Sequence, residues 1–355
     1  GVEKLLATQE LVDSDVIVTN TSGAHAATIA ESTFGMLVYL ARRYERLLKA
    51  QDDHIYVKLS DYDPVGLAGM TVGIIGLGIM GNSMARHILS ADWPIHVYNR
   101  TKAKADDLVD RGAVWMDTPG EVASQSDVII TMLGYPHDVE EVYLGSGGLV
   151  ECASDGAYMI DMTTSSPSLA QKIADAASAR GLRALDAPVS GGDVGAREAK
   201  LAIMMGGAEE DFKTVLPLME LMGTNICHLG GPGAGQHTKM ANQVVIASTL
   251  VGVCEGLLYA KKVGLDPKQV LETIGTGAAG SFQLNVLGPR MLDGAFDPGF
   301  YAHHFMKDMD IALTECGVNG FDLPGMKMVR GMFDDFKNEF GTDFGTQALF
   351  KLYDR

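Results

Sequence analysis

A glycine-rich turn between an apolar strand and a helix constrains this chain more than any other feature. Residues 71–89 read TVGIIGLGIMGNSMARHIL, in which Val72–Ile75 predicts a strand buried on both faces and the apolar spacing after the glycines predicts a helix. In the G-x-G-x-x-G, the first glycine makes the tight turn, the second lets backbone approach a pyrophosphate, and the third lets helix pack close on strand. The helix N-terminus adds free N–H groups for phosphates, so we predict dinucleotide binding; the alternative is a tight turn that merely needs glycine. The predicted cofactor contacts are Gly76, Leu77, Gly78, Ile79, Met80 and Gly81.

The end of the next predicted strand indicates which nucleotide is bound. Ile95–Tyr98 reads as a strand, and Asn99, Arg100 and Thr101 follow it. NAD-binding folds usually place an acid about 20 residues after the first glycine, to hold the ribose 2′-hydroxyl, and this chain has none there. A guanidinium instead grips a 2′-phosphate with a planar fork. We therefore expect these three residues to bind NADP in preference to NAD, and NAD remains possible if Arg100 is only a solvated charge.

Strands and helices alternate from residue 71 to about residue 229, as a doubly wound parallel sheet requires. Two further strands are predicted at Val128–Met132 and Tyr158–Asp161. Ligands in such folds lie beyond the carboxyl ends of the strands, so the loops there are expected beside the cofactor. Each loop has an ordinary alternative as a turn or a helix N-cap. The loop residues predicted to contact the cofactor are Met132, Leu133 and Thr164.

Composition bounds the size of the protein and its partners. The 355 residues predict two or three domains, and an apolar content of 46% is ample for a large core. A net charge of −17, with the acids scattered, argues against nucleic-acid and membrane-surface partners. The four cysteines are far apart, which indicates buried thiols in a reducing cytoplasm rather than disulfides or a zinc site. The chain shows no signal peptide, and its longest apolar run, Val244–Cys254, is too short for a bilayer, so we expect a cytoplasmic protein.

A long apolar helix is predicted from about Gln236 to Val263. Its middle is apolar nearly all round, so it must be covered on every side. This requirement places it between the nucleotide-binding domain and a helical C-terminal domain. A second subunit would supply part of the cover, which predicts a homodimer or a homotetramer.

Lys239 lies near the start of this helix, and Asn242 and Gln243 share its face. An ammonium at the dry end of an apolar helix, near the positive helix N-terminus, has its charged form disfavoured. A lysine whose pKa falls from ~10.4 toward ~7 to 8 can exchange a proton with an alcohol or carbonyl oxygen near neutral pH. The sequence therefore predicts that Lys239 can exchange a proton with a bound oxygen group, and the alternative is an ordinary surface lysine.

The segment Ser190-Gly191-Gly192 combines a small hydroxyl with two residues that lack side chains. Such a loop can wrap a carboxylate with the hydroxyl and backbone N–H groups. We predict that it binds an anionic group of the substrate. The alternative is a glycine turn before the strand predicted at Leu201–Met205.

Four motifs in order, GLGIMG, DAPVSGG, KMANQ and FMKDMD, resemble those of the β-hydroxyacid dehydrogenases over Met70 to about Phe350. The resemblance implies an α/β fold, with a Rossmann-type nucleotide-binding domain, a long interdomain helix and an all-α C-terminal domain. It implies that the serine–glycine loop binds the substrate carboxylate and that Lys239 is the general acid/base. The other residues it implicates are Asn242 and Gln243 near the substrate and Lys307, paired with Asp308, near the nicotinamide. The chain departs from the family at Gln243, where a second asparagine is usual, and near Lys200, where a glycine often stands.

Residues 1–68 form a segment of their own, with a long helix predicted at Ala27–Ala50. The segment resembles the crossover region of D-2-hydroxyacid dehydrogenases, but the chain has no counterpart of their catalytic Arg, Glu and His motifs. We interpret it as a packing or dimerisation element. The predicted domains are therefore this segment, an NADP-binding domain at 69–230 and a C-terminal substrate and dimerisation domain at 231–355.

These observations predict an NADPH-dependent oxidoreductase that interconverts a small β-hydroxy or 2-hydroxy acid with its semialdehyde or oxo acid. Two alternatives stay open. One is an imine reductase-like enzyme, although such enzymes generally lack the lysine found here at Lys239. The other is a non-catalytic scaffold that keeps NADP as a ligand. His303 and His304 invite a metal interpretation, but no further ligand at a suitable spacing supports it, and no metal is expected.

Overall fold

The computed structural model describes residue 67 and residues 69–354. The chain divides into two compact units, Gly1–Gly66 and Leu67–Arg355. The first unit lies outside the described residues, and with it the helix predicted at 27–50 and the packing role predicted for the N-terminal segment. The second unit contains every residue predicted to form the site.

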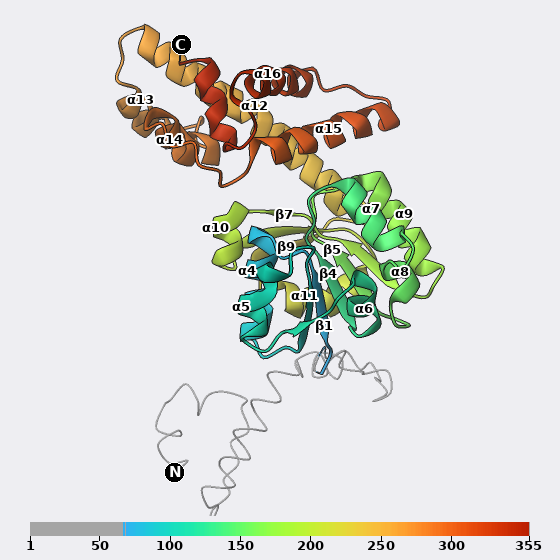
Figure 1. The fold of residues 1–355 in the computed structure, drawn as a ribbon. Coiled ribbons are helices and arrows are strands. Elements are labelled where there is room, and N and C mark those ends of the chain that lie inside the picture. The colour runs from blue at the N-terminus through green and yellow to red at the C-terminus, as the bar shows by residue number, and fades with distance from the viewer. Residues whose placement is uncertain (1–66, 68, 355) are drawn as a thin grey trace, which may run out of the picture. The chain divides into compact units, whose positions relative to one another are not determined.

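Six parallel strands form the main sheet of the second unit, in the order β3-β2-β1-β4-β5-β6 (Figure 1). The chain starts at the centre with β1, builds outward to β3, and returns to the other side of β1 with β4. The carboxyl ends of β1 and β4 therefore flank the point where the strand order reverses, which is where ligands bind in such sheets. The strands are β1 (Val72–Ile75), β2 (Ile95–Tyr98), β3 (Val114–Trp115), β4 (Val128–Thr131), β5 (Tyr158–Asp161) and β6 (Arg183–Asp186). This confirms the doubly wound sheet.

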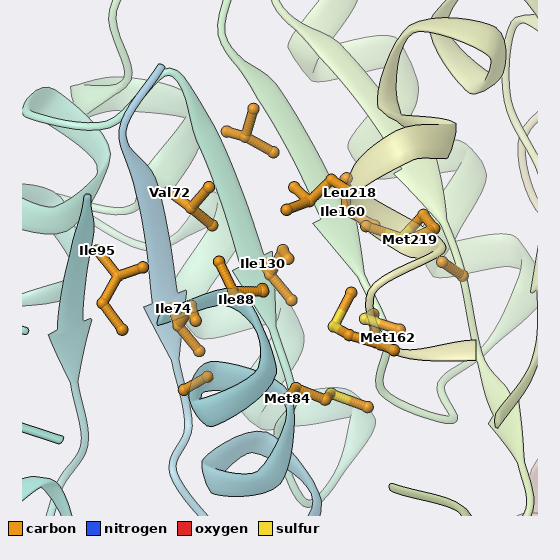
Figure 2. Close-up of a cluster of buried hydrophobic side chains, with 14 of the residues drawn as sticks. Val72, Ile74, Met84, Ile88, Ile95, Ile130, Ile160, Met162, Leu218 and Met219 are labelled. Carbon is orange, nitrogen blue, oxygen red and sulfur yellow. The ribbon is translucent and has the colours of Figure 1, made fainter. Parts of the chain in front are cut away.

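Helices cover both faces of this sheet because its central strands are apolar on both sides. Every residue of β1, β4 and β5 is buried. Figure 2 shows one of the two cores, where Val72 and Ile74 of β1 lie against Met84 and Ile88 of α4. The second core lies on the other face and includes Val139. The helices of this region are α4 (Ile79–Ser90), η2 (Lys102–Ala105), α5 (Asp106–Val109), α6 (Pro119–Ser124), α7 (Pro136–Leu144), α8 (Leu149–Cys152) and α9 (Pro167–Ser178).

A smaller three-stranded sheet follows, in the order β7-β8-β9. Its strands β7 and β8 pair antiparallel, whereas β8 and β9 pair parallel. A bridge between Asp186 and Gly206 links the end of β6 to the end of β8. The elements are β7 (Val189–Ser190), α10 (Gly192–Arg197), β8 (Leu201–Met205), α11 (Glu209–Met219) and β9 (Gly223–His228). The strand predicted at 201–205 is confirmed.

The C-terminal third is helical and is built around α12 (Ala234–Lys262), which Figure 1 shows running from the sheets into the other helices. Its buried core combines Leu250 and Leu257 of α12 with Phe305 and Phe333. The remaining elements are α13 (Pro267–Ile274), the π-helix η3 (Gln283–Leu287), α14 (Gly288–Leu292), α15 (Ala302–Asn319), α16 (Pro324–Phe340) and η4 (Thr346–Leu352). The predicted all-α C-terminal domain is confirmed.

One expectation about burial is wrong, and another stays a prediction. Within this chain Val245 and Tyr259 of α12 are 65% and 68% exposed, so complete cover of the long helix still depends on the predicted second subunit. By length and apolar composition alone α12 could cross a membrane, but it packs in the helical core and begins with a buried polar turn. The cysteines are all free, as expected, yet not all are buried, since Cys227 is exposed and Cys152 is half-buried.

Candidate active site

The glycines of the first turn have three distinct environments. Gly76 has φ of 95°, and a Cβ there would overlap the carbonyl oxygen of Met132. A Cβ at Gly81 would overlap the carbonyl oxygen of Gly76, so α4 packs directly on the turn. A Cβ at Gly78 would meet nothing within 4 Å. The first and third glycines are therefore required by packing, and the second leaves the open face that a pyrophosphate needs.

Asn99 ties this turn to the end of β2. Its Oδ1 accepts a hydrogen bond from the Leu77 amide at 2.9 Å, and its Nδ2 donates to the Thr101 carbonyl at 2.9 Å. The side chain of Leu77 points into the core and is buried. Leu77 and Thr101 are therefore joined through Asn99, and neither lines the cleft. Their contact with the cofactor stays a prediction.

Arg100 stands at the mouth of the cleft, where its side chain is 80% exposed. One guanidinium nitrogen lies 3.2 Å from Oδ1 of Asp138, whose other oxygen accepts from the Tyr135 amide. Lys104 also lines the cleft. Arg100 therefore lies where the ribose end of a dinucleotide is expected, and the residues directly after β2 include no carboxylate.

A single cleft of about 1890 Å³ brings most of the predicted residues together, from the glycine turn to the starts of α12 and α15. Those that line it are Gly76, Gly78, Ile79, Met80, Gly81, Asn99, Arg100, Met132, Leu133, Thr164, Ser190, Gly191, Gly192, Lys239, Asn242, Gln243 and Lys307. Residues from both domains thus share one continuous space.

Lys239 lies in the second turn of α12 and is only 7% exposed. Its Nζ donates to the carbonyl oxygen of Val189 at 2.8 Å, directly before the serine–glycine loop. Burial lowers the pKa of Lys239 to about 8; Asp308 opposes this shift, and Lys307 adds to it. The amine therefore faces the cleft in a dry setting, in which it can gain or lose a proton near neutral pH.

A chain of polar contacts runs from Asn242 to the start of α15. The Nδ2 of Asn242 donates to Oε1 of Gln243 at 2.8 Å, and Nε2 of Gln243 donates to Oδ2 of Asp308 at 2.5 Å. Lys307 lies 3.1 Å from the other oxygen of Asp308 and donates to the carbonyl of Thr164 at 2.6 Å. The pairing of Lys307 with Asp308 is confirmed. Both ends of the Gln243 amide have a protein partner, and both Asn242 and Gln243 line the cleft with hydrogen-bonding capacity left.

The serine–glycine loop turns sharply at the end of β7. Gly191 and Gly192 have φ of 130° and 62°, which L side chains rarely adopt. Ser190 is half-buried and lines the cleft beside the residue that receives the Lys239 amine. A hydroxyl and a glycine backbone thus lie next to the buried ammonium, which suits a small carboxylate.

Three buried polar residues organise this region, although none was predicted to belong to the site. Asp161 accepts from Thr131 Oγ1 at 2.8 Å and from the Thr163 amide at 3.1 Å, and burial raises the pKa of Asp161 to about 6. Asp186 binds the N-terminus of α12, and Gln236 bonds the loop after β5. The sequence carried little signal for Asp186 and Gln236, because these partners lie at least 47 residues away along the chain.

The histidine pair of α15 does not form a metal site. Burial lowers the pKa of His304 to about 4, with a further lowering from His303 and Lys307. His304 packs against the ring of Tyr135, and His303 against that of Tyr301. Within residues 69–354, no group of three or more His, Cys, Asp or Glu side chains is placed to hold a metal ion.

Comparison with known proteins decides the family. Residues 71–230 match the family model described as the NAD binding domain of 6-phosphogluconate dehydrogenase, and residues 233–353 match that described as NAD-binding of NADP-dependent 3-hydroxyisobutyrate dehydrogenase. The chain belongs to the β-hydroxyacid dehydrogenase family. It is 54% identical over 283 residues to the oxidoreductase YkwC of Bacillus subtilis, across 80% of this chain and 98% of that protein.

Two further members of the family indicate the general reaction of this β-hydroxyacid dehydrogenase. It is 39% identical to 2-hydroxy-3-oxopropionate reductase of Escherichia coli, across 79% of this chain and 96% of the relative. The 3-hydroxyisobutyrate dehydrogenase of Mycobacterium tuberculosis, solved with L-serine, superposes with a TM-score of 0.74 at 26% identity, across 80% and 98% of the two chains. The protein is therefore an NAD(P)-dependent hydroxyacid dehydrogenase of the 3-hydroxyisobutyrate dehydrogenase type, which acts on a CH–OH group.

Proposed function

We propose that this enzyme prefers NADP and interconverts a small β-hydroxy or 2-hydroxy acid with its semialdehyde or oxo acid. One observation carries the proposal: the buried amine of Lys239 opens into the same cleft as the glycine turn. An amine with a lowered pKa beside a dinucleotide site is the arrangement that proton transfer coupled to hydride transfer requires.

The cofactor residues fit a phosphorylated dinucleotide. The open face at Gly78 and the start of α4 suit the pyrophosphate, while Arg100 and Lys104 offer cations for a 2′-phosphate. The match of the C-terminal half to an NADP-dependent family model also supports NADP. When bound, the reduced cofactor supplies the hydride.

The protein's own residues hold the substrate and move the proton. Ser190 and the two glycines after it bind the carboxylate, and Asn242 adds an amide contact. The protonated amine of Lys239 hydrogen-bonds the carbonyl oxygen and gives up its proton as negative charge develops there. Asp308 and Gln243 fix the polar surroundings of that amine. The Val189 carbonyl, which accepts a hydrogen bond from the amine, holds it at the edge of the substrate loop.

We also propose that the enzyme works in the cytoplasm as a homodimer or a homotetramer. The four free thiols suit a reducing compartment. Tyr259 and Val263, at the end of α12, are 68% and 52% exposed and leave apolar surface that a second copy would cover. Size-exclusion chromatography with light scattering tests the assembly, and a monomeric mass at micromolar concentration contradicts it.

A substrate panel tests the function. Purified enzyme is mixed with NADPH or NADH and with glyoxylate, succinic semialdehyde or tartronate semialdehyde, and loss of the reduced cofactor is followed by absorbance. We expect turnover with at least one of these acids and a higher kcat/KM with NADPH. Absence of turnover with every small oxo acid overturns the substrate class, and a higher kcat/KM with NADH overturns the cofactor preference.

A further inference from the structure

The start of α12 is fastened to the nucleotide-binding domain by two buried polar side chains, Asp186 and Gln236. We propose that these are positioning residues, which set the place of the Lys239 amine relative to the loops that carry cofactor and substrate. The inference rests on the proposed role of Lys239 as the proton donor. Neither residue is among those predicted to touch cofactor or substrate, and neither lines the cleft.

Asp186 clamps the helix from the end of β6. Its Oδ1 accepts from the Gly233 amide at 2.7 Å and its Oδ2 accepts from the Gln236 amide at 2.8 Å. Both amides belong to the first turn, where helical N–H groups have no partner within the helix. A carboxylate at this position also meets the positive end of the helix dipole. The helix end is thus held by a charge from 47 to 50 residues earlier in the chain.

The space around this carboxylate admits only glycine. A Cβ at Gly206 would lie 2.5 Å from Asp186 Oδ1, and one at Gly235 would lie 2.8 Å from Oδ2. Gly233 adopts φ of 86°, which delivers its amide to the carboxylate. Asp186 is 4% exposed, so the clamp is dry as well as tight. Such a clamp fixes both the position and the rotation of the helix.

Gln236 connects the same helix turn to the loop after β5. Its Nε2 donates to the Thr163 carbonyl at 2.7 Å, and its Oε1 accepts from the Ser165 amide at 2.9 Å. The residue between these two, Thr164, lines the cleft and receives Lys307 through its carbonyl. Gln236 therefore holds the helix of Lys239 and the cofactor-side loop at a fixed separation.

The spacing along α12 transmits this constraint to the amine. Gln236 and Lys239 are three residues apart, so they are neighbours on one helix face. The charges that act on the Lys239 amine come from Asp308 and Lys307 on α15, and not from Asp186. Loss of the clamp would therefore act through geometry, and a misplacement of about 1 Å can lower a rate about 100-fold.

The test compares Asp186→Asn and Gln236→Met with a matched control, Glu315→Gln. Glu315 is also a buried carboxylate that bonds the start of a helix. It belongs to α15 and accepts from the hydroxyls of Ser166 and Ser168, at the start of α9, at 2.8 and 2.9 Å. It fastens α9 rather than α12, and it does not line the cleft. The measurements are kcat, the Kd for NADPH, the deuterium isotope effect with NADPH labelled at the transferred hydride, the pH profile of reduction, and Tm.

For both α12 variants we expect kcat to fall about 100-fold because the amine is misplaced. The NADPH Kd should change little, because the glycine turn at the start of α4 is untouched. The isotope effect should rise, since hydride transfer becomes slower than the other steps. The alkaline limb of the reduction profile should move up from about pH 8, because an amine that gains water recovers its ordinary pKa. Glu315→Gln should lower Tm as much as Asp186→Asn does and leave kcat and the pH limb near those of the wild type.

Unchanged kcat and pH limb in Gln236→Met and Asp186→Asn, or an equal loss of kcat in Glu315→Gln, overturn the positioning role. If Asp186→Asn does not fold, Gln236→Met decides alone, because it removes one side chain's bonds and leaves the carboxylate clamp in place. A Lys239→Met variant separates the two proposals. Full turnover in it overturns the proposed function itself, whereas an inactive Lys239→Met beside fully active α12 variants overturns only the positioning role.

Discussion

The two ends of the cleft are lined by different kinds of chemical group. At the cofactor end the contacts are backbone and glycine, with Arg100 largely in water. At the other end they are buried side chains, in which Lys239, Gln243 and Asp308 are each held by another protein group. A binding surface made of backbone needs only the right turn, whereas a proton donor needs a dry setting and a fixed position. We therefore expect substitutions at the two ends to separate binding from chemistry.

The largest effect is expected at the buried amine. Lys239→Met keeps the length of the side chain and removes the proton donor, so kcat should fall about 1000-fold, within the range for loss of general acid catalysis. The NADPH Kd should stay close to the wild-type value, because the glycine turn is untouched. Steady-state kinetics together with fluorescence titration of NADPH measure the two quantities. Wild-type turnover in this variant would contradict the assignment.

The glycine turn offers a pair of substitutions that separate packing from binding. Gly81→Ala places a Cβ against the Gly76 carbonyl and should lower the free energy of unfolding by about 3 kcal/mol. Gly78→Ala meets no protein atom and has an ordinary φ of −67°, so its stability should change by less than about 1 kcal/mol. Its NADPH Kd should nevertheless rise, because the Cβ blocks the approach of the pyrophosphate. Denaturant unfolding measures the free energy of unfolding, and NADPH titration measures the Kd. Equal destabilisation by both alanines would contradict the separate roles of the two glycines.

Asp161 predicts a stability that depends on pH. Its pKa is raised to about 6 in the folded protein, so folding favours the protonated form, and the stability present below the unfolded pKa is lost as the pH rises through 6. Asp161→Asn, which stays neutral and can still accept from Thr131, should match the wild type near pH 3, below the unfolded pKa of 3.8, because the carboxyl is then protonated in both states. At pH 8 it should be more stable by about 2 to 3 kcal/mol. Urea unfolding at the two pH values measures this, and a difference that is the same at both would rule the effect out.

The smallest effect is expected at the exposed cation. Arg100→Ala should raise the KM for NADPH about tenfold, since a solvated phosphate contact contributes about 1.4 kcal/mol. The KM for NADH should hardly change, and Tm should not fall, because the pair with Asp138 is exposed on one side. Parallel kinetics with the two cofactors measure the ratio. An equal rise for both would show that Arg100 does not read the phosphate.

The parts of the fold and site that could be predicted are those determined by residues close together in the sequence. The strand–glycine–helix unit needs residues that are adjacent in the sequence, so β1, its turn and α4 followed from the pattern in Val72–Ile75 and the glycines after it. The low pKa of Lys239 also followed from the apolar helix around it, and the lowering to about 8 agrees with that prediction. These features depend on a few turns of chain and little else.

Features that join distant segments could not be predicted. Asp186 is visible in the sequence as part of DAPVSGG, but nothing local shows that its carboxylate meets Gly233 and the next helical turn. Gln243 is expected near the substrate by resemblance, and it lines the cleft, but the sequence did not show that its amide also bonds Asn242 and Asp308. The even apolar pattern of α12 predicted cover on all sides, although the single chain leaves Val245 in water. In each case the residue could be identified in the sequence, but the group that it contacts in the folded protein could not.

The two hydrogen bonds made by the Asn99 side chain limit how the cofactor preference of this enzyme could be redesigned. The amide of Asn99, which is predicted to lie near the cofactor ribose, also closes the glycine turn through the Leu77 amide and the Thr101 carbonyl. An aspartate introduced at Asn99 to favour NADH would still accept from the Leu77 amide. Its second oxygen would replace the amide nitrogen and repel the Thr101 carbonyl oxygen. A change of coenzyme is therefore better engineered at Arg100, whose side chain holds no part of the turn together.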